Sequence, residues 1–168
     1  MRIGRRLAWS GLGAGAIYWL ARYLRPKHST LVLNEKVVLV TGASSGIGRS
    51  LAYSFARRGA RLVLVARRED RLEAVRREIE PYTSDVLVLP ADITDERQLR
   101  EVVQRTVDAF GRIDVLVNDA GISQAGQLQD LDPERIERLL RLNLWSVIRL
   151  TQLVLPYMLQ QSSGYIMN

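Results

Sequence analysis

The first residues of this chain that could do chemistry lie in the segment from Val37 to Gly48. Four apolar residues, Val37 to Val40, lead into a turn of small residues, and a helical pattern opens at Gly46. A strand, such a turn and a helix N-terminus form a phosphate site, because backbone N–H groups and the helix dipole point at one spot. Small side chains also let a pyrophosphate approach the backbone closely. The segment therefore predicts a site for a phosphorylated ligand.

The chain around this turn alternates between short apolar runs and longer amphipathic ones. Strands are expected at Val37–Thr41, Arg61–Ala66, Val86–Pro90 and Ile113–Asn118. Helices are expected at Gly46–Arg58, Glu69–Glu80, Asp95–Phe110 and Pro133 to about Gln160. Continuous apolar strands that alternate with helices indicate a parallel sheet covered on both faces.

Capping residues support these helix bounds. Gly59 and Gly111 lie where a left-handed residue ends a helix. Asp95 with Gln98 resembles an N-cap pair, and Asp132 followed by Pro133 is a typical helix start. Pro156 is expected to bend the last helix or to mark its end.

Composition excludes several classes of function. Of 168 residues, 47% are apolar, which is enough for one domain with a buried core. There is no cysteine and a single histidine, His28, so no disulfide framework and no metal site are expected. The net charge of +6 lies wholly in residues 1–34, and 18 basic residues balance 18 acidic ones from Glu35 onward. A neutral body argues against nucleic-acid binding, which needs a basic face.

The chain from Glu35 to Asn168 carries several motifs in one order, and in this it resembles the short-chain dehydrogenase/reductase family. Thr41–Gly48 resembles that family's T-G-x-x-x-G-x-G turn. The other matching segments are Asp92–Asp95, Val117–Gly121, Asn143-Leu144 with Thr151, Leu155-Pro156 and Met158, and Gly164–Asn168. They resemble the family's D-[VI]-[ST]-[DN] segment, its N-N-A-G segment, its long fourth helix and the opening of its fifth strand. A glycine turn alone is a weak signal, and the ordered set carries the resemblance.

The resemblance implies a Rossmann-like α/β fold, a doubly wound parallel sheet of strand order 3-2-1-4-5-6-7. Residues 35–168 would hold this domain only as far as the start of the fifth strand. A dinucleotide would lie across the carboxyl ends of strands 1 and 4, where the order reverses. The implied cofactor-binding residues are Thr41, Gly42, Ser44, Ser45, Gly46, Ile47, Gly48, Asp92, Ile93, Asn118, Ala120 and Gly121. Among these residues, Asp92 and Ile93 should border the adenine. A separate segment, Ser123–Leu128, is expected beside the substrate pocket.

Arg67 and Arg68 predict which nicotinamide cofactor binds. Folds that prefer NAD usually carry a carboxylate at the end of the second strand, about 20 residues past the glycine turn. That position is Ala66, and the two arginines follow it. An arginine pairs with a 2′-phosphate through charge-assisted hydrogen bonds, so NADP(H) is favoured over NAD(H). In the alternative interpretation both arginines are solvated, and Glu69 or Asp70 binds the ribose.

The family's catalytic residues are only partly present. By resemblance, a tyrosine acts as general acid/base, a lysine four residues later lowers its pKa, and a serine positions the carbonyl. These three should follow the fifth strand, where this sequence stops. The family's asparagine matches Asn143. Tyr23 and Lys27 have the required spacing, but Pro26 interrupts the helical turn between them.

Asp119 departs from the family pattern, which has asparagine at that position. An ionised carboxylate accepts hydrogen bonds but donates none, so any bond that the amide would donate is lost.

Residues 1–34 read as a leader and linker. The stretch 7–24 is 18 residues long with Arg22 as its one charge, and as a helix it would span roughly 27 Å of a ~30 Å bilayer core. We therefore expect an N-terminal apolar helix that anchors the protein in a membrane. The domain would lie on the cytoplasmic side, where nicotinamide cofactors are supplied. An organelle transit peptide, a cleaved secretory signal and a twin-arginine signal at Arg5–Arg6 are the alternatives.

Two interpretations from different classes follow. In the first, the chain is the cofactor-binding part of an NADP(H)-dependent oxidoreductase for a carbonyl or alcohol substrate, without turnover as given. The long helix resembles a dimer surface of the family, which leaves a homo-oligomer of the full-length protein open. In the second, it is a complete, non-catalytic, membrane-anchored nucleotide-binding or interaction module. The second would leave strand four as an apolar edge only partly covered by a short fifth strand, and such edges invite aggregation.

Overall fold

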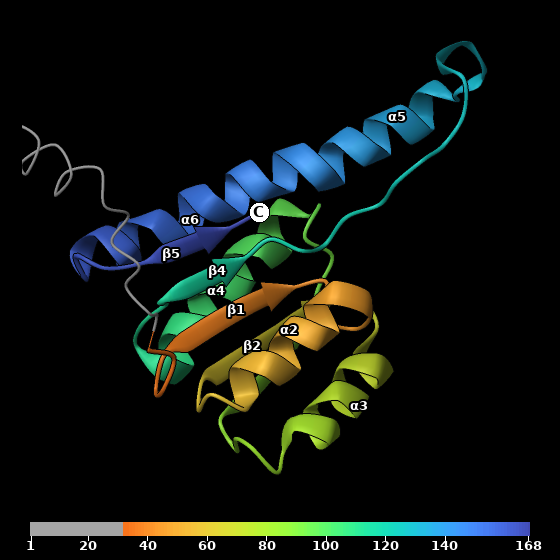
Figure 1. Cartoon of the computed structure of the whole chain (residues 1–168). Coiled ribbons are helices and arrows are strands. Elements are labelled where there is room, and N and C mark those ends of the chain that lie inside the picture. Colours follow the sequence, from red (N-terminus) through yellow and green to blue (C-terminus); the bar gives the residue numbers. More distant parts are fainter. Residues whose placement is uncertain (1–31) are drawn as a thin grey trace, which may run out of the picture. The chain divides into compact units, whose positions relative to one another are not determined.

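The computed structural model describes residues 32–168. Within this range the chain forms a five-stranded parallel sheet with helices on both faces (Figure 1). The predictions for the leader, including the apolar helix at 7–24, lie outside the described residues. Among residues 32–168, no helix combines the length and the hydropathy that crossing a membrane requires.

The strands are β1 (Val37–Thr41), β2 (Arg61–Ala66), β3 (Val86–Pro90), β4 (Val115–Val117) and β5 (Tyr165–Met167). Their order in the sheet is β3-β2-β1-β4-β5, as the resemblance implies for the first five strands. The first three strands have the predicted bounds, and β4 is shorter than predicted at both ends. Single backbone hydrogen bonds continue past β4, from Asp114 N–H to Val37 O (2.9 Å) and from Asn118 N–H to Met167 O (2.8 Å).

The exposed edge of the sheet differs from the expectation. Every residue of β4 pairs with β5, so β4 is an interior strand. Within residues 32–168, β5 is the edge strand on this side of the sheet and β3 on the other, and Tyr165, Ile166 and Met167 of β5 are 37–42% exposed. The prediction that strand four is an apolar edge is therefore wrong, because β5 covers it along its whole length.

The helices are α2 (Gly46–Ala56), α3 (Glu69–Ile79), α4 (Glu96–Phe110), α5 (Pro133–Leu140) and α6 (Ser146–Gln160), with a short 3₁₀ turn, η1 (Leu128–Asp130). The predicted last helix is interrupted by a π-helical segment, η2 (Arg141–Trp145), between α5 and α6. Pro156 lies inside α6 and does not end it.

The predicted caps are present in three of these helices. The side chain of Asp132 accepts from Glu134 N–H (3.0 Å) at the start of α5. Gly111 caps α4 with a left-handed φ of 71°. Past the end of α2, Gly59 N–H donates to Ala56 O, which closes the last turn.

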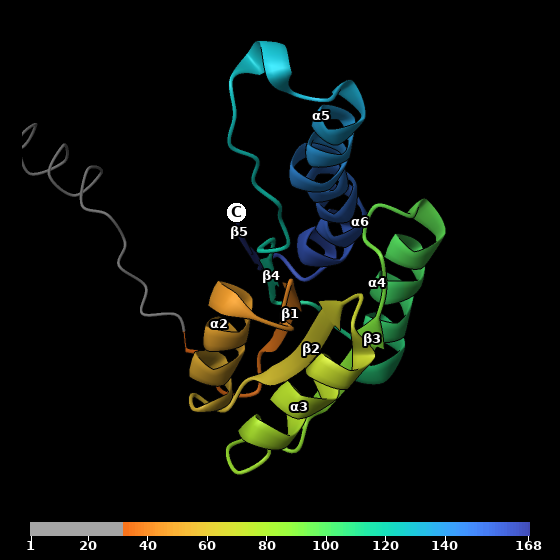
Figure 2. The same ribbon diagram turned by 90° about the vertical axis from the view of Figure 1, so that its right-hand side faces the viewer.

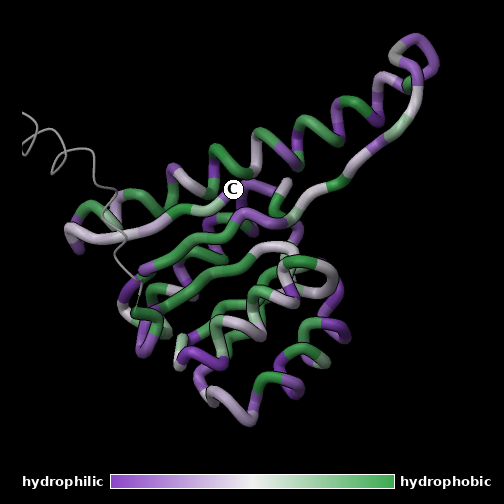
Figure 3. The backbone as a smooth tube through the Cα atoms, viewed as in Figure 1, coloured by the Kyte–Doolittle hydropathy of each residue, from purple (hydrophilic) through white to green (hydrophobic). Residues whose placement is uncertain are grey.

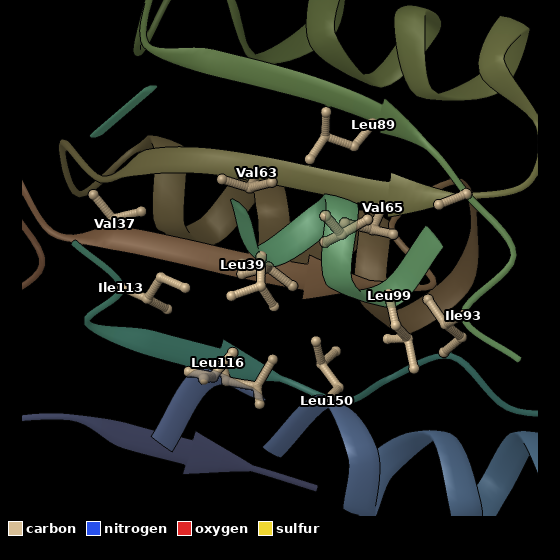
Figure 4. Close-up of a cluster of buried hydrophobic side chains, with 14 of the residues drawn as sticks. Val37, Leu39, Val63, Val65, Leu89, Ile93, Leu99, Ile113, Leu116 and Leu150 are labelled. Atoms are coloured by element: carbon tan, nitrogen blue, oxygen red, sulfur yellow. The ribbon is translucent and has the colours of Figure 1, made fainter. Parts of the chain in front are cut away.

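The sheet separates two helical layers. Figure 2 shows α2 and α3 on one face and α4 and α6 on the other, and Figure 3 shows the inner strands as continuous hydrophobic segments. Because side chains alternate along a strand, Val37 and Leu39 of β1 face α4 and α6. There they join Val63 of β2, Leu99 of α4 and Leu150 of α6 in one buried cluster (Figure 4). This packing fixes the strand ends from which the site is built.

A buried carboxylate ties the amino ends of β1 and β4 together. Asp114, whose side chain is 3% exposed, accepts from Arg112 (2.6 and 2.8 Å), Lys36 (3.2 Å) and Val37 N–H (3.0 Å). Burial raises the pKa of this carboxyl, but the hydrogen bonds from Arg112, Val37 and Lys36 outweigh burial and hold the pKa below its ordinary value. This cluster lies at the opposite end of the strands from the candidate site.

Candidate functional site

A cleft of about 630 Å³ opens at the carboxyl ends of the parallel strands. It is lined by the turns that follow β1, β2, β3 and β4 and by residues of α5 and η2. The point between β1 and β4 is where the strand order reverses, because β2 lies on one side of β1 and β4 on the other. Ligands of doubly wound sheets bind at such a point, and the volume is within the range of small-molecule sites.

The turns after β1 and β4 are packed directly against each other. Thr41 is fully buried, and its Oγ1 donates to Val117 O (3.2 Å) and accepts from the N–H groups of Asp119 and Ala120 (3.1 Å each). Gly42 has a φ of +69°, and a Cβ there would lie 2.9 Å from the backbone N and Cα of Ala120. Glycine is required here both by the left-handed backbone and by the close approach.

The N-terminus of α2 is open to the cleft. Ser45 is its N-cap residue and makes no side-chain cap hydrogen bond, which leaves the N–H groups of the first turn available to an anion. Ser44, Ser45, Gly46 and Ile47 line the cleft, and Ile47 is 69% exposed.

Arg67 and Arg68 follow β2 and are exposed on the cleft wall. Arg68 Nη2 donates to Ser44 Oγ over 3.4 Å, so the guanidinium already reaches the turn after β1. Glu69 and Asp70 lie in the first turn of α3 and are absent from the lining that the described residues form. The end of β2 therefore presents positive charge to the cleft.

The turn after β3 is held by its own hydrogen bonds. Asp92 Oδ1 accepts from Thr94 N–H (2.9 Å) and Thr94 Oγ1 (2.7 Å). Asp95 caps α4 by accepting from Arg97 and Gln98 N–H, and these bonds, led by that from Gln98, lower its pKa. Of the predicted Asp95–Gln98 pair, only the bond from Gln98 N–H to the Asp95 side chain forms. The Gln98 side chain does not bond back to Asp95, because its Oε1 accepts from Asp92 N–H (2.9 Å). This bond joins α4 to the cleft wall.

The turn after β4 is clamped by the long helix. Asn143, in η2, accepts from Ile122 N–H through Oδ1 (2.9 Å) and donates to Ile122 O through Nδ2 (2.7 Å). Both polar backbone groups of Ile122 are thus paired with one amide side chain. π-helical segments inside helices frequently occur at functional sites.

The structure brings most of the predicted cofactor-binding residues to the cleft. All of them line it except Thr41, Gly48 and Asn118. Thr41 and Gly48 are buried behind the lining, and Asn118 Nδ2 donates to Asn168 Oδ1 (2.8 Å). Of the segment Ser123–Leu128, expected beside the substrate, residues 123–127 do not contribute to the lining.

Sequence reasoning missed part of the wall. Arg138, Arg141 and Leu142, from the start of the long helix, also line the cleft, together with Ile122 and Thr94. The spacing of Arg138, Arg141 and Leu142 at i, i+3 and i+4 places them on one helix face, which was a usable signal. Which face meets the cleft depends on tertiary packing.

Comparison with known proteins decides the family. The sequence profile described as short chain dehydrogenase matches residues 36–168. The chain belongs to the short-chain dehydrogenase/reductase family. An uncharacterized oxidoreductase of Staphylococcus epidermidis is 37% identical over 136 residues, which are 81% of this chain and 58% of that protein. The 11-beta-hydroxysteroid dehydrogenase A of Sesamum indicum is 44% identical over 133 residues, 78% of this chain and 38% of that protein.

Solved structures of this family share the fold. A metagenomic short-chain oxidoreductase in complex with NADP superposes with a TM-score of 0.77 and 34% identity, covering 80% of this chain and 62% of that one. A short-chain type dehydrogenase/reductase from Mycobacterium marinum gives a TM-score of 0.76 at 32% identity, covering 80% of this chain and 55% of that one. The chain spans about half the length of the curated relatives it matches.

Proposed function

We propose that this chain supplies the cofactor-binding part of an NADP(H)-dependent oxidoreductase that acts on a carbonyl or alcohol substrate. The observation that carries the proposal is the cleft itself. It combines a turn that only glycine fits, an uncapped helix N-terminus and two arginines at the end of β2. Family membership supports the oxidoreductase chemistry, and the similar structure in complex with NADP supports the choice of cofactor.

Each part of the cleft fits one part of a dinucleotide. The N–H groups of the first turn of α2 suit the pyrophosphate. Arg67 and Arg68 suit a 2′-phosphate, which a carboxylate in their place would repel. Asp92 and Ile93 would border the adenine, on the wall next to β2. When bound, the nicotinamide supplies or accepts the hydride.

In this proposal Asn143 orders the inner wall of the cleft. Its amide holds both backbone groups of Ile122, so the turn after β4 has one position relative to the long helix. Gly121 lies beneath this amide, since a Cβ there would be 3.3 Å from Asn143 Oδ1. The side chain thereby fixes the surface against which the inner half of the cofactor would rest.

Equilibrium titration with NADPH and NADH tests the cofactor assignment. Arg68→Gln and Arg67→Gln should each raise the Kd for NADPH by at least about tenfold, because a hydrogen bond to a charged group contributes ~1.5–3 kcal/mol. The Kd for NADH should stay within about twofold, since it has no 2′-phosphate. Arg105→Gln, an exposed residue of α4 outside the cleft, is the matched control. A wild-type protein that binds NADH more tightly than NADPH would contradict the assignment.

We also propose that residues 7–24 anchor the protein in a membrane, with the domain on the cytoplasmic side. The length and composition of this run support the anchor, and the supply of nicotinamide cofactors inside cells supports the cytoplasmic side. Deleting residues 1–31 should move the protein from the membrane fraction to the supernatant. If the protein is instead targeted to an organelle, intact-mass measurement would show a shortened N-terminus.

A further inference from the structure

Asp119 brings a carboxylate to the place where the proposed cofactor's pyrophosphate would bind. The residue follows β4 and lines the cleft. A Cβ on Gly48, in the first turn of α2, would lie 2.7 Å from Asp119 Oδ2 and 2.6 Å from Gly42 O. The carboxylate therefore reaches the junction between the glycine turn and the N-terminus of α2.

The carboxylate is held in place but is not neutralised. The backbone N–H of Asp119 donates to the buried Thr41 Oγ1 (3.1 Å), which fixes the position of the residue. Its side chain makes no hydrogen bond or ion pair with any residue between 32 and 168. The positive end of a helix favours any anion placed there, so the Asp119 carboxylate and a bound pyrophosphate would share the same end of α2.

We infer that Asp119 is an affinity-limiting residue of the cleft, whose charge weakens dinucleotide binding by repelling the pyrophosphate. The inference rests on the proposed function. Two anions would share the positive end of one helix in a half-buried site, where charges are screened less than in water. The asparagine found at this position in the family pattern carries no charge and would not repel the ligand.

The repulsion has two consequences that a purely structural role lacks. The pyrophosphate is common to NADPH and NADH, so removing the charge should tighten both by the same factor. Repulsion between partly exposed charges is also screened by salt, so the gain should shrink as ionic strength rises.

The test is a titration of the full chain and of its Asp119→Asn variant with NADPH and NADH, at low and at high salt. The variant should bind both cofactors about tenfold more tightly at low salt, and the gain should be smaller, but not abolished, near 1 M salt. Asp119→Ser should show the same gain and serves if the asparagine variant does not fold. Asp108→Asn removes an exposed charge of α4 outside the cleft and should change neither Kd.

Four results would overturn the inference, and the last of them would also refute the proposed function. Equal or weaker binding by both Asp119 variants would refute the repulsion, and NADPH binding by the wild type would then leave the proposed function intact. A gain for one cofactor alone would place the carboxylate away from the pyrophosphate. Tightening by Mg²⁺ of the wild type but not of Asp119→Asn would mean that the carboxylate recruits a cation. If neither the wild type nor a variant binds any dinucleotide, the proposed function fails as well.

Discussion

Substituting Gly42 by alanine tests the most constrained contact of the cleft. The new Cβ would lie 2.9 Å from the N and Cα of Ala120, and the backbone there has a φ of +69°. The contact is with backbone, which cannot rotate away, so the turns after β1 and β4 must separate. Gly111→Ala is a matched control, because its φ is +71° but nothing lies within 4 Å of the added Cβ.

The comparison separates the two costs. Both variants place an alanine in the left-handed region, which costs roughly 1–2 kcal/mol. Only Gly42→Ala adds overpacking, at about 1–3 kcal/mol. The difference in the free energy of unfolding should therefore be about 2 kcal/mol, or roughly 4–8 °C in melting temperature for a chain of this size.

Thermal unfolding and NADPH titration of the two variants provide the assay. Gly42→Ala should melt below Gly111→Ala and lose measurable NADPH binding, whereas Gly111→Ala should bind with the wild-type Kd. Equal melting temperatures would show that the packing of the two turns is not the constraint we describe. Unchanged NADPH binding by a folded Gly42→Ala would refute the role of this turn as the cofactor cradle.

Three further predictions concern other parts of the domain. Burial raises the pKa of the Asp114 carboxyl, but its hydrogen bonds, led by those from Arg112, lower the pKa by more than that. The carboxylate therefore stabilises the fold fully at any pH above the unfolded pKa near 4. This stabilisation is lost as the pH falls through the pKa of Asp114 in the folded state. Asp114→Asn should therefore lower the free energy of unfolding in urea by about 2 kcal/mol at pH 7, and by less below about pH 4. A difference between wild type and variant that does not change with pH would contradict this. Asn143→Leu removes both bonds to Ile122 and should cost about 1 kcal/mol and speed amide hydrogen exchange at residues 121–123, and unchanged exchange there would argue against the clamp. Leu144 is 54% exposed on η2, and we predict that it lies in a homo-oligomer interface, so Leu144→Glu should lower the mass measured by light scattering; an unchanged mass would contradict this.

The regular part of the fold could be predicted from the sequence because its signals are local. The strands β1, β2 and β3 are built on the apolar runs 37–40, 62–66 and 86–91, and their bounds came out as predicted. The cap at Asp132 is likewise a property of adjacent residues. The strand order came from the family resemblance, since pairing between distant strands has no local signature.

The rest depends on packing that no short segment determines. The π-helical segment η2 adds a wider turn inside an amphipathic helix, and the apolar pattern on either side does not reveal it. Arg138 of α5 and Arg141 of η2 reach the cleft only because tertiary packing places this part of the long helix beside it. The direction of the Gln98 bond, to Asp92 rather than back to Asp95, is also set by tertiary contacts.

Amide hydrogen exchange measured with and without NADPH shows where the ligand binds. Addition of NADPH should slow exchange in the turns at residues 42–48 and 118–122. Exchange should stay unchanged at the opposite ends of the strands, in residues 111–114, where Asp114 lies. No protection in either turn at saturating NADPH, or protection confined to residues outside the cleft, would contradict the proposal that this cleft is a nicotinamide cofactor site.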